Sequence, residues 1–182
     1  LERAANLISS FKKVAVDQSS AESRSFEVKD LLDEVLITLS AKIKSANVAV
    51  SIACPNHLIV TSKPGPINQI LINLILNSIY HAFDGVDDRE ININIISLSG
   101  QLNIHYCDNG VGLDENIKNK VFEPFTTTKR GSGGSGLGMH LVYNLVTQAL
   151  AGHINVQSEP HQGVNFDITF PVEIISDQKN NN

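Results

Sequence analysis

An almost wholly apolar stretch of the chain, residues 66–83, carries a polar side chain at every fourth position of one stripe. Gln69, Asn73, Asn77 and His81 make up this stripe, and their spacing predicts a helix on which the four share one face. Because a buried amide without a partner costs about 1–3 kcal/mol, this face needs partners. They are either groups of the protein itself or a ligand site in which an amide oxygen binds a hard cation such as Mg²⁺. The helix alone favours neither interpretation.

A second group of polar residues follows a strand-like run. Residues 102–107 alternate in polarity and end at Asp108, which is followed by Gly110 and Gly112. Asp-Asn-Gly is common in turns, so a simple turn is one interpretation. The other is a ligand site, in which a carboxylate at the end of a strand accepts a hydrogen bond from the amine of a planar ligand.

A third group is a glycine-rich segment. Phe122, Pro124 and Phe125 precede five glycines within residues 131–138, and a helix is predicted over residues 140–151. A helix N-terminus with free N–H groups is a ready site for phosphate. The string GSGGSG matches G-x-G-x-x-G, but no strand directly precedes it, and no G-K-[ST] is present, so neither a dinucleotide fold nor a Walker A loop is indicated. A flexible linker is the alternative.

Hydrophobic periodicity predicts the elements that would position these groups. Helices are expected over residues 29–47, 66–83 and 140–151, with Gly152 capping the last of them. Strands are expected over residues 48–54, 57–61, 91–98, 102–107, 153–158 and 164–170. Helices mixed with hairpins in this order predict an α+β fold built as a layered sandwich.

Composition excludes several classes of protein. The chain has 182 residues, a net charge of −5 and 42% hydrophobic residues, as expected of one globular domain and not of a basic nucleic-acid-binding module. Cys54 and Cys107 match no paired metal or redox spacing, and no apolar run is long enough to span a membrane. Residues 1–15 show a short heptad-like seam, residues 17–25 form a polar linker, and residues 176–182 are expected to be a disordered tail. The start at Leu1 suggests a fragment of a longer protein.

Four motifs together resemble a known family. In order, NLILN (73–77), DNGVGL (108–113), FEPF (122–125) and GSGLGM (134–139) resemble the N, G1, F and G2 boxes of sensor histidine kinases. The resemblance covers roughly residues 26–175. It implies the Bergerat fold, a two-layer α/β sandwich whose mixed, mostly antiparallel sheet has helices on one face. It also implies three parts of the chain: the end of a dimerisation helix with a linker (1–25), a catalytic ATP-binding domain (26–175) and the tail (176–182).

The resemblance further implies a cofactor and the residues that bind it. The cofactors are ATP and Mg²⁺, with Asn77 as the metal ligand, Asp108 as the acceptor for the adenine amine, and residues from about 113 to 135 as the ATP lid. The implied cofactor-binding residues are Asn73, Asn77, His81, Asp108, Gly110, Gly112, Leu113, Thr127, Thr128, Lys129, Gly134, Ser135, Gly136, Leu137 and Gly138. Many family members carry a basic residue at the position of Tyr80, for which His81 is a possible substitute.

Two further residue types bear on the reaction. ATPases of the same fold carry a glutamate at the position of Asn73, and an amide has no basic form near neutral pH with which to activate water. Asn73 therefore disfavours a stand-alone ATPase. None of the six histidines precedes an acidic residue, as the phosphoacceptor of the family does, so the chain is expected to bind Mg-ATP without phosphorylating itself.

The sequence thus predicts the catalytic domain of a sensor histidine kinase that donates the γ-phosphoryl group of ATP to a histidine of a dimerisation domain. The alternatives are an ATPase of the same fold and a nucleotide-binding module without turnover. The expected partners are that dimerisation and histidine-phosphotransfer domain, the receiver domain of a response regulator, and a second copy in a homodimer of the full-length protein. A cytoplasmic location is expected, and nucleic acid is not.

Overall fold

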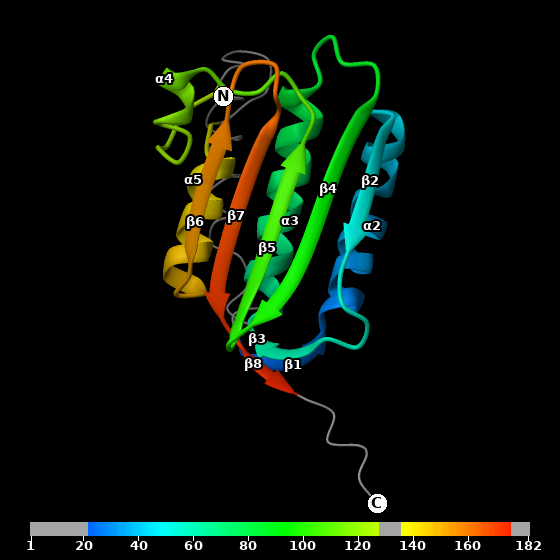
Figure 1. Ribbon diagram of the computed structural model, residues 1–182, viewed down its shortest axis with the longest axis vertical. Coiled ribbons are helices and arrows are strands. Elements are labelled where there is room, and N and C mark those ends of the chain that lie inside the picture. The colour runs from blue at the N-terminus through cyan, green and yellow to red at the C-terminus, as the bar shows by residue number, and fades with distance from the viewer. Residues whose placement is uncertain (1–21, 128–135, 176–182) are drawn as a thin grey trace, which may run out of the picture.

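The computed structural model describes residues 22–127 and 136–175, which form two sheets and a layer of helices (Figure 1). The strands are β1 (Arg24–Glu27), β2 (Val48–Ala53), β3 (Ile59–Ser62), β4 (Arg89–Leu98), β5 (Gln101–Asp108), β6 (His153–Ser158), β7 (Val164–Pro171) and β8 (Glu173–Ile175). The helices are α2 (Val28–Ser45), α3 (Pro64–Asn77), α4 (Glu115–Lys118) and α5 (Gly138–Asn144), and π-helical turns η2 (Ser78–Ala82) and η3 (Leu145–Ala149) extend α3 and α5.

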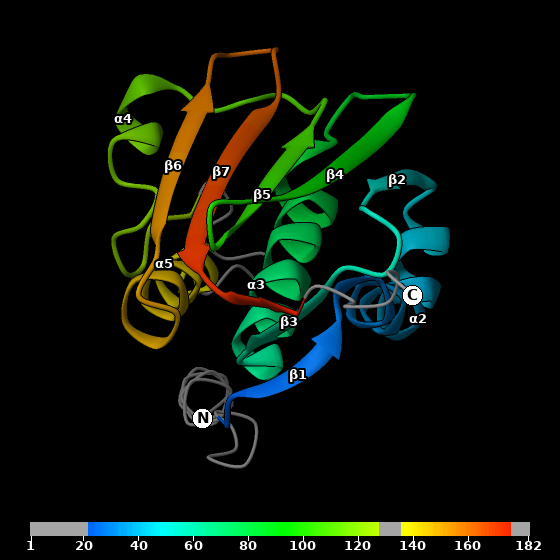
Figure 2. The same ribbon diagram turned by 60° about the horizontal axis from the view of Figure 1, so that its bottom comes forward.

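The larger sheet has the strand order β2-β4-β5-β7-β6. Only the pair β2–β4 is parallel, and the other three pairs are antiparallel. Buried and exposed residues alternate along β4 and β5, so that one face of this sheet is covered and the other lies open to solvent. The smaller sheet, β1-β3-β8, is antiparallel and lies at one end of the domain (Figure 2).

The covered face packs against α2, α3 and α5, with α3 in the middle (Figure 2). No residue of α3 is exposed, which follows from its composition, because apolar residues cover most of its circumference. In α2 the buried residues recur at three- and four-residue intervals, which limits its contact to a single stripe. The result is a two-layer α/β sandwich with a mixed, mostly antiparallel sheet, as the family resemblance of the four motifs implies.

Several local predictions are wrong. Helix α3 begins at Pro64 and α5 at Gly138, each two residues earlier than expected. Arg24 and Ser25 belong to β1, paired with β3, although the polar composition of residues 17–25 predicts a linker. The strands β1 and β8 and the helix α4 were not predicted, because each is only three or four residues long and shows no periodicity of its own.

The end of the last helix also differs from the prediction. Ala151 and not Gly152 adopts the left-handed conformation, with a φ of 53°. A Cβ atom on Gly152 would lie 2.5 Å from the carbonyl oxygen of Thr169, so this glycine allows η3 to approach β7. Cys54 and Cys107 are half-buried free thiols. No helix within residues 22–127 and 136–175 is long and apolar enough to cross a membrane.

Candidate nucleotide site

Asp108 is the last residue of β5, and its contact with Ser78, which directly follows α3, places it near the C-terminal end of that helix. Its side chain is 7% exposed and receives three hydrogen bonds. The Ser78 hydroxyl donates to Oδ2 at 2.6 Å, while the backbone N–H groups of Gly110 and Val164 donate to Oδ1 at 3.0 and 3.3 Å. A carboxylate offers about four acceptor positions, so one on Oδ2 remains for a ligand.

The glycine segment after Asp108 lies against two other parts of the chain. Gly110 contacts Ala82 at the end of η2, and the N–H of Val111 donates to the Ala82 carbonyl at 2.8 Å. Gly112 has a φ of +69°, and a Cβ atom there would lie 2.0 Å from the carbonyl oxygen of Glu159. Only glycine meets both requirements, because it lacks a Cβ and tolerates a positive φ. The segment is therefore held close to Asp108 and is not a free turn.

The polar face predicted for the helix over residues 66–83 lies toward the start of α5. A Cβ atom on Gly138 would lie 3.3 Å from Asn77 Oδ1 and 3.5 Å from Asn73 Oδ1. Asn73 Nδ2 donates to the Gln69 carbonyl at 2.7 Å, so one amide is satisfied within the helix. Asn77 Nδ2 is buried and has no hydrogen-bond partner. His81 follows on η2, one turn later.

These residues fit a triphosphate with a hard cation. The unpaired Asn77 amide nitrogen lacks an acceptor, which a phosphate oxygen would provide, and an amide oxygen is a ligand type that Mg²⁺ accepts. Both features occur beside Gly138, where the absence of a side chain leaves room next to the amide. The fit rests on Asn77 more than on Asn73, whose amide nitrogen already has a partner.

Tyr80, at the position where many kinases carry a basic residue, is paired with a lysine of another helix. The Lys42 ammonium of α2 donates to the Tyr80 hydroxyl at 2.8 Å and lies 5.5 Å from the centre of the ring. The Tyr80 side chain is 49% exposed. A cation is thus present beside this position, although it comes from α2 and was not anticipated from the sequence.

The two ends of the glycine-rich segment are held together. The Phe125 N–H donates to the Gly136 carbonyl at 2.8 Å, and His140 Nδ1 lies 3.0 Å from the Phe122 carbonyl. Leu113 is placed by its N–H, which donates to the Ser158 hydroxyl at 2.8 Å. Thr127 is the last described residue before the segment, and Leu137 directly precedes α5. The predicted site residues Thr128, Lys129, Gly134 and Ser135 lie outside the described residues.

Ser78 and Tyr106 are polar groups of the site that the sequence analysis missed. Both are buried, and the Ser78 hydroxyl contacts both the Tyr106 hydroxyl and Asp108. Ser78 lies off the four-residue polar stripe, while Tyr106 occupies an apolar position of its strand. A small polar residue directly after Asn77 in an otherwise apolar helix was the available signal.

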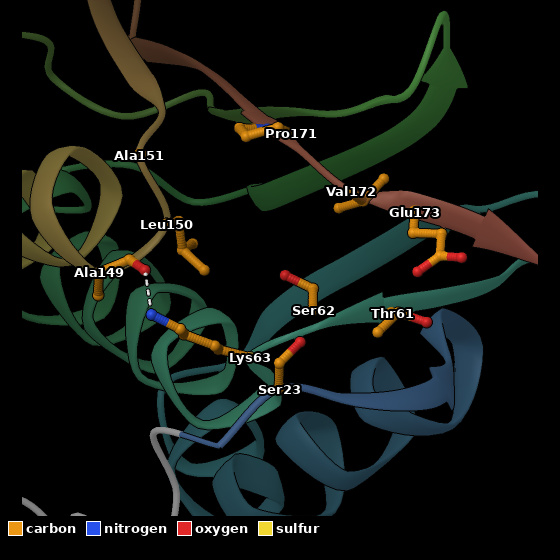
Figure 3. A pocket seen from close by; sticks show the side chains of 10 residues that line it. All are labelled: Ser23, Thr61, Ser62, Lys63, Ala149, Leu150, Ala151, Pro171, Val172 and Glu173. Carbon is orange, nitrogen blue, oxygen red and sulfur yellow. Dashed lines mark hydrogen bonds between the residues drawn. The ribbon is translucent and has the colours of Figure 1, made fainter.

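A cavity of about 370 Å³ lies at the other end of α3, near its first residues (Figure 3). The only ammonium group among the residues that line it is that of Lys63, and this group already donates a hydrogen bond to the Ala149 carbonyl at 2.9 Å. We therefore assign no ligand to this cavity, whose lining residues are Ser23, Thr61, Ser62, Lys63, Ala149, Leu150, Ala151, Pro171, Val172 and Glu173.

Comparison with known proteins decides the family. Residues 62–174, more than half of the chain, match the family model described as histidine kinase-, DNA gyrase B-, and HSP90-like ATPase. The chain belongs to this ATPase family. Within it, the chain is similar to sensor histidine kinases and corresponds to their ATP-binding catalytic domain, as the four motifs predict.

Two curated relatives and one solved structure illustrate the similarity. Autoinducer 2 sensor kinase/phosphatase LuxQ of Vibrio cholerae is 32% identical over 93% of this chain, and sensor histidine kinase AtsR of Burkholderia thailandensis is 31% identical over 96%. The chain spans only 20% and 30% of their respective lengths. The catalytic domain of histidine kinase ThkA is 27% identical, with a TM-score of 0.71 over 82% of this chain and 95% of that domain. The Bergerat fold is thereby confirmed for the catalytic domain.

The burial of Asp108 predicts a pH effect on the stability of the catalytic domain. Burial raises the pKa of Asp108 above the 3.8 of a free aspartate, and hydrogen bonds from Ser78, Gly110 and Val164 offset only part of this. The folded state therefore holds the proton more tightly than the unfolded state, so this group's contribution to stability decreases as the pH rises from 3.8 through the raised pKa.

Asp108→Asn removes this contribution. In urea titrations we expect the unfolding free energy of the Asn variant, minus that of the wild type, to increase as the pH rises across that window, because only the wild type loses this contribution. Asp167→Asn, on the half-exposed partner of His105, makes the same change of side chain outside the site and is the matched control. Parallel pH profiles for the wild type and Asp108→Asn would contradict the prediction.

Proposed function

We propose that this domain binds Mg-ATP between α3 and α5 and presents the γ-phosphoryl group to a histidine of a dimerisation domain outside the sequence. The observation that carries the proposal is the convergence of Asp108 at the end of β5 with the unpaired Asn77 amide beside Gly138. One buried anion and one buried amide at the same end of the α3–sheet interface suit a ligand with a base amine at one end and phosphates at the other.

In this proposal each residue has a defined task. Asp108 accepts the hydrogen bond of the adenine amine, while Gly110, Gly112 and Leu113 border the base. Asn77 holds Mg²⁺, and Asn73 and His81 lie on the same helix face. The residues proposed to contact phosphate are Thr127, Thr128, Lys129, Gly134, Ser135, Gly136, Leu137 and Gly138. When bound, ATP supplies the phosphoryl group and Mg²⁺ neutralises part of its charge.

The residue types favour phosphoryl transfer over hydrolysis. Asn73 has no basic form with which to activate water, and phosphoryl transfer relies mainly on positioning and charge stabilisation. A nucleotide site without a general base is therefore adequate for a kinase and poorly suited to an ATPase. The proton of the acceptor histidine is left to the dimerisation domain.

One expected partner, a response regulator, has support in a solved structure. The complex of histidine kinase ThkA with response regulator protein TrrA contains the same fold, with a TM-score of 0.69, and full-length ShkA in complex with AMPPNP contains it with a TM-score of 0.73. By analogy we propose a response regulator receiver domain and a homodimer of the longer protein as partners. Residues 1–23 would then be the end of the dimerisation helix with its linker.

The proposal is tested by calorimetric titration of the chain with a non-hydrolysable ATP analogue, with and without Mg²⁺. We expect Mg²⁺ to strengthen binding, and Asn77→Ala to remove this effect of Mg²⁺, a loss of about tenfold or more in affinity, because the variant lacks the amide oxygen. Asn155→Ala, an exposed asparagine on β6, is the matched control.

Three results would count against the proposal. Absence of binding in the wild type would favour a module that has lost its nucleotide, and steady release of phosphate from ATP would favour an ATPase. Stable labelling of the chain alone by radioactive ATP would place an acceptor within this sequence.

A further inference from the structure

Behind Asp108 lies a buried chain of hydroxyl groups that none of the proposed functions uses. The Ser78 Oγ lies 2.6 Å from Asp108 Oδ2 and 2.7 Å from the Tyr106 Oη. The Tyr106 Oη lies 3.1 Å from the Leu74 carbonyl oxygen, one helical turn before Ser78. Ser78 is 3% exposed and Tyr106 is 0% exposed, so water does not compete for these groups.

The direction of each hydrogen bond follows from counting protons. An ionised carboxylate only accepts, so the single proton of Ser78 points to Asp108. The 2.7 Å contact between the two hydroxyls still needs a proton, which Tyr106 must supply, with the Leu74 carbonyl as its second and longer acceptor. Tyr106 keeps its proton because burial raises its pKa well above the ordinary value.

Tyr106 also restricts where Ser78 can turn. A serine in a helix often donates to the carbonyl four residues earlier, which for Ser78 is that of Leu74. In this structure the Leu74 carbonyl accepts from Tyr106 instead. The Ser78 hydroxyl is thereby directed to the carboxylate.

The same count limits what Asp108 can offer a ligand. Oδ1 faces two backbone N–H groups, from Gly110 and Val164, so a proton on Asp108 would reside on Oδ2. On Oδ2 that proton has Ser78 as an acceptor at 2.6 Å if the chain reverses and runs from Ser78 to Tyr106 and on to Leu74. Ser78 thus competes with a ligand for any proton on Oδ2, and by donating to the carboxylate it favours the ionised form of Asp108, which only accepts.

We infer that Ser78 and Tyr106 are positioning residues that make Asp108 a pure acceptor and so select a purine with an exocyclic amine over one with a carbonyl at the same position. The inference rests on the proposed role of Asp108 in reading the base. A 6-amino group donates to the free position on Oδ2. A 6-oxo group directs its own lone pairs at the carboxylate, and Ser78 disfavours the protonated form of Asp108 that could donate to it.

The test compares two ligands on four chains. Dissociation constants of non-hydrolysable ATP and GTP analogues are measured for the full chain and for Ser78→Ala, Ser78→Thr and Tyr106→Phe. We expect Ser78→Ala to lower the preference for ATP about tenfold, the effect of losing one hydrogen bond to a charged group. Tyr106→Phe should lower the preference by a smaller factor, and Ser78→Thr should restore it because it keeps the hydroxyl.

Controls separate this effect from general damage. Ser40→Ala removes a hydroxyl that donates to the Ile37 carbonyl on the exposed face of α2. It should change the dissociation constant of neither analogue. Equal weakening of both ligands by Ser78→Ala would indicate only a structural role and overturn the inference. Unchanged affinities for both ligands in Ser78→Ala would also overturn it while leaving the proposed function intact. A wild-type chain that binds neither analogue would overturn both.

A second measurement needs no variant and covers the case in which Ser78→Ala fails to fold. The wild-type chain is titrated with ATP, with a triphosphate whose purine carries only hydrogen at position 6, and with inosine triphosphate. We expect affinity to fall in that order, because hydrogen merely loses the bond whereas the 6-oxo group is repelled. Binding of inosine triphosphate as tight as that of the 6-hydrogen analogue would show that Asp108 donates, and the inference would be wrong.

Discussion

Asp108→Asn is expected to weaken binding of a non-hydrolysable ATP analogue by about a hundredfold or more, without unfolding the domain. Oδ1 of Asp108 accepts two backbone N–H groups, so the amide oxygen of an asparagine would occupy that side. The NH₂ group would then take the place of Oδ2 and face the adenine amine, donor against donor. Losing a hydrogen bond to a charged group costs about 1.5–3 kcal/mol, and the new mismatch adds to this.

The same substitution leaves the hydrogen bonds behind it satisfied. The asparagine NH₂ can donate to Ser78, Ser78 to Tyr106, and Tyr106 to the Leu74 carbonyl, which is the reversed direction of the chain. A folded protein that has lost binding is therefore the expected outcome, measured by calorimetry and thermal unfolding together. Asp167→Asn makes the identical change on the open face of the sheet and should bind normally. Retained affinity in Asp108→Asn would remove Asp108 from base recognition.

The helix face that carries Asn73 and Asn77 illustrates what could be predicted from sequence. Its four-residue repeat lies within one element, so the geometry of that element alone decides which side chains share a face. The position of Asp108 at the end of a strand was predictable for the same reason, since alternation along residues 102–107 depends only on neighbours in the chain.

The partners of these groups could not be predicted in the same way. Val164 donates to Asp108 across 56 positions of sequence, and Lys42 reaches Tyr80 across 38. Such contacts depend on strand register and on which helices are neighbours, and neither is encoded in local periodicity. The strand β8 is a further case, because three exposed residues form a strand only where β3 offers a free edge.

The π-helical turn η2 lies between these two cases. The apolar pattern of residues 66–83 continues through it, so a helix was expected there, but not the wider turn. The turn follows Asn77 directly and contains Ser78, which bonds to Asp108 and Tyr106. Such turns occur often at functional sites. Here the hydrogen bond from Ser78 to Asp108 links this turn to the end of β5. It therefore fixes the position of Asn77 relative to Asp108, the residues proposed to bind the phosphates and the base.

Gly163→Ala is expected to destabilise the domain by about 3–5 kcal/mol and to abolish nucleotide binding, although Gly163 touches no proposed ligand. Gly163 has a φ of +73°, and a Cβ atom there would lie 1.9 Å from the carbonyl oxygen of Asp108. Its own carbonyl accepts from Ser158 at 2.6 Å, and the next residue, Val164, donates to the Asp108 carboxylate. A shift that relieves the clash must therefore displace a donor of the site.

Gly85 offers a matched control for this prediction, because its φ is also +73° while a Cβ atom there would meet nothing within 4 Å. Gly85→Ala should cost only the backbone strain, about 1–2 kcal/mol. The difference between the two variants in urea unfolding isolates the close approach of Gly163 to Asp108. Equal losses of unfolding free energy in both variants would mean that the β6–β7 turn can shift to relieve the clash without further destabilisation. In that case Asp108 would not depend on Gly163 for its position, and affinity for the ATP analogue should survive in Gly163→Ala.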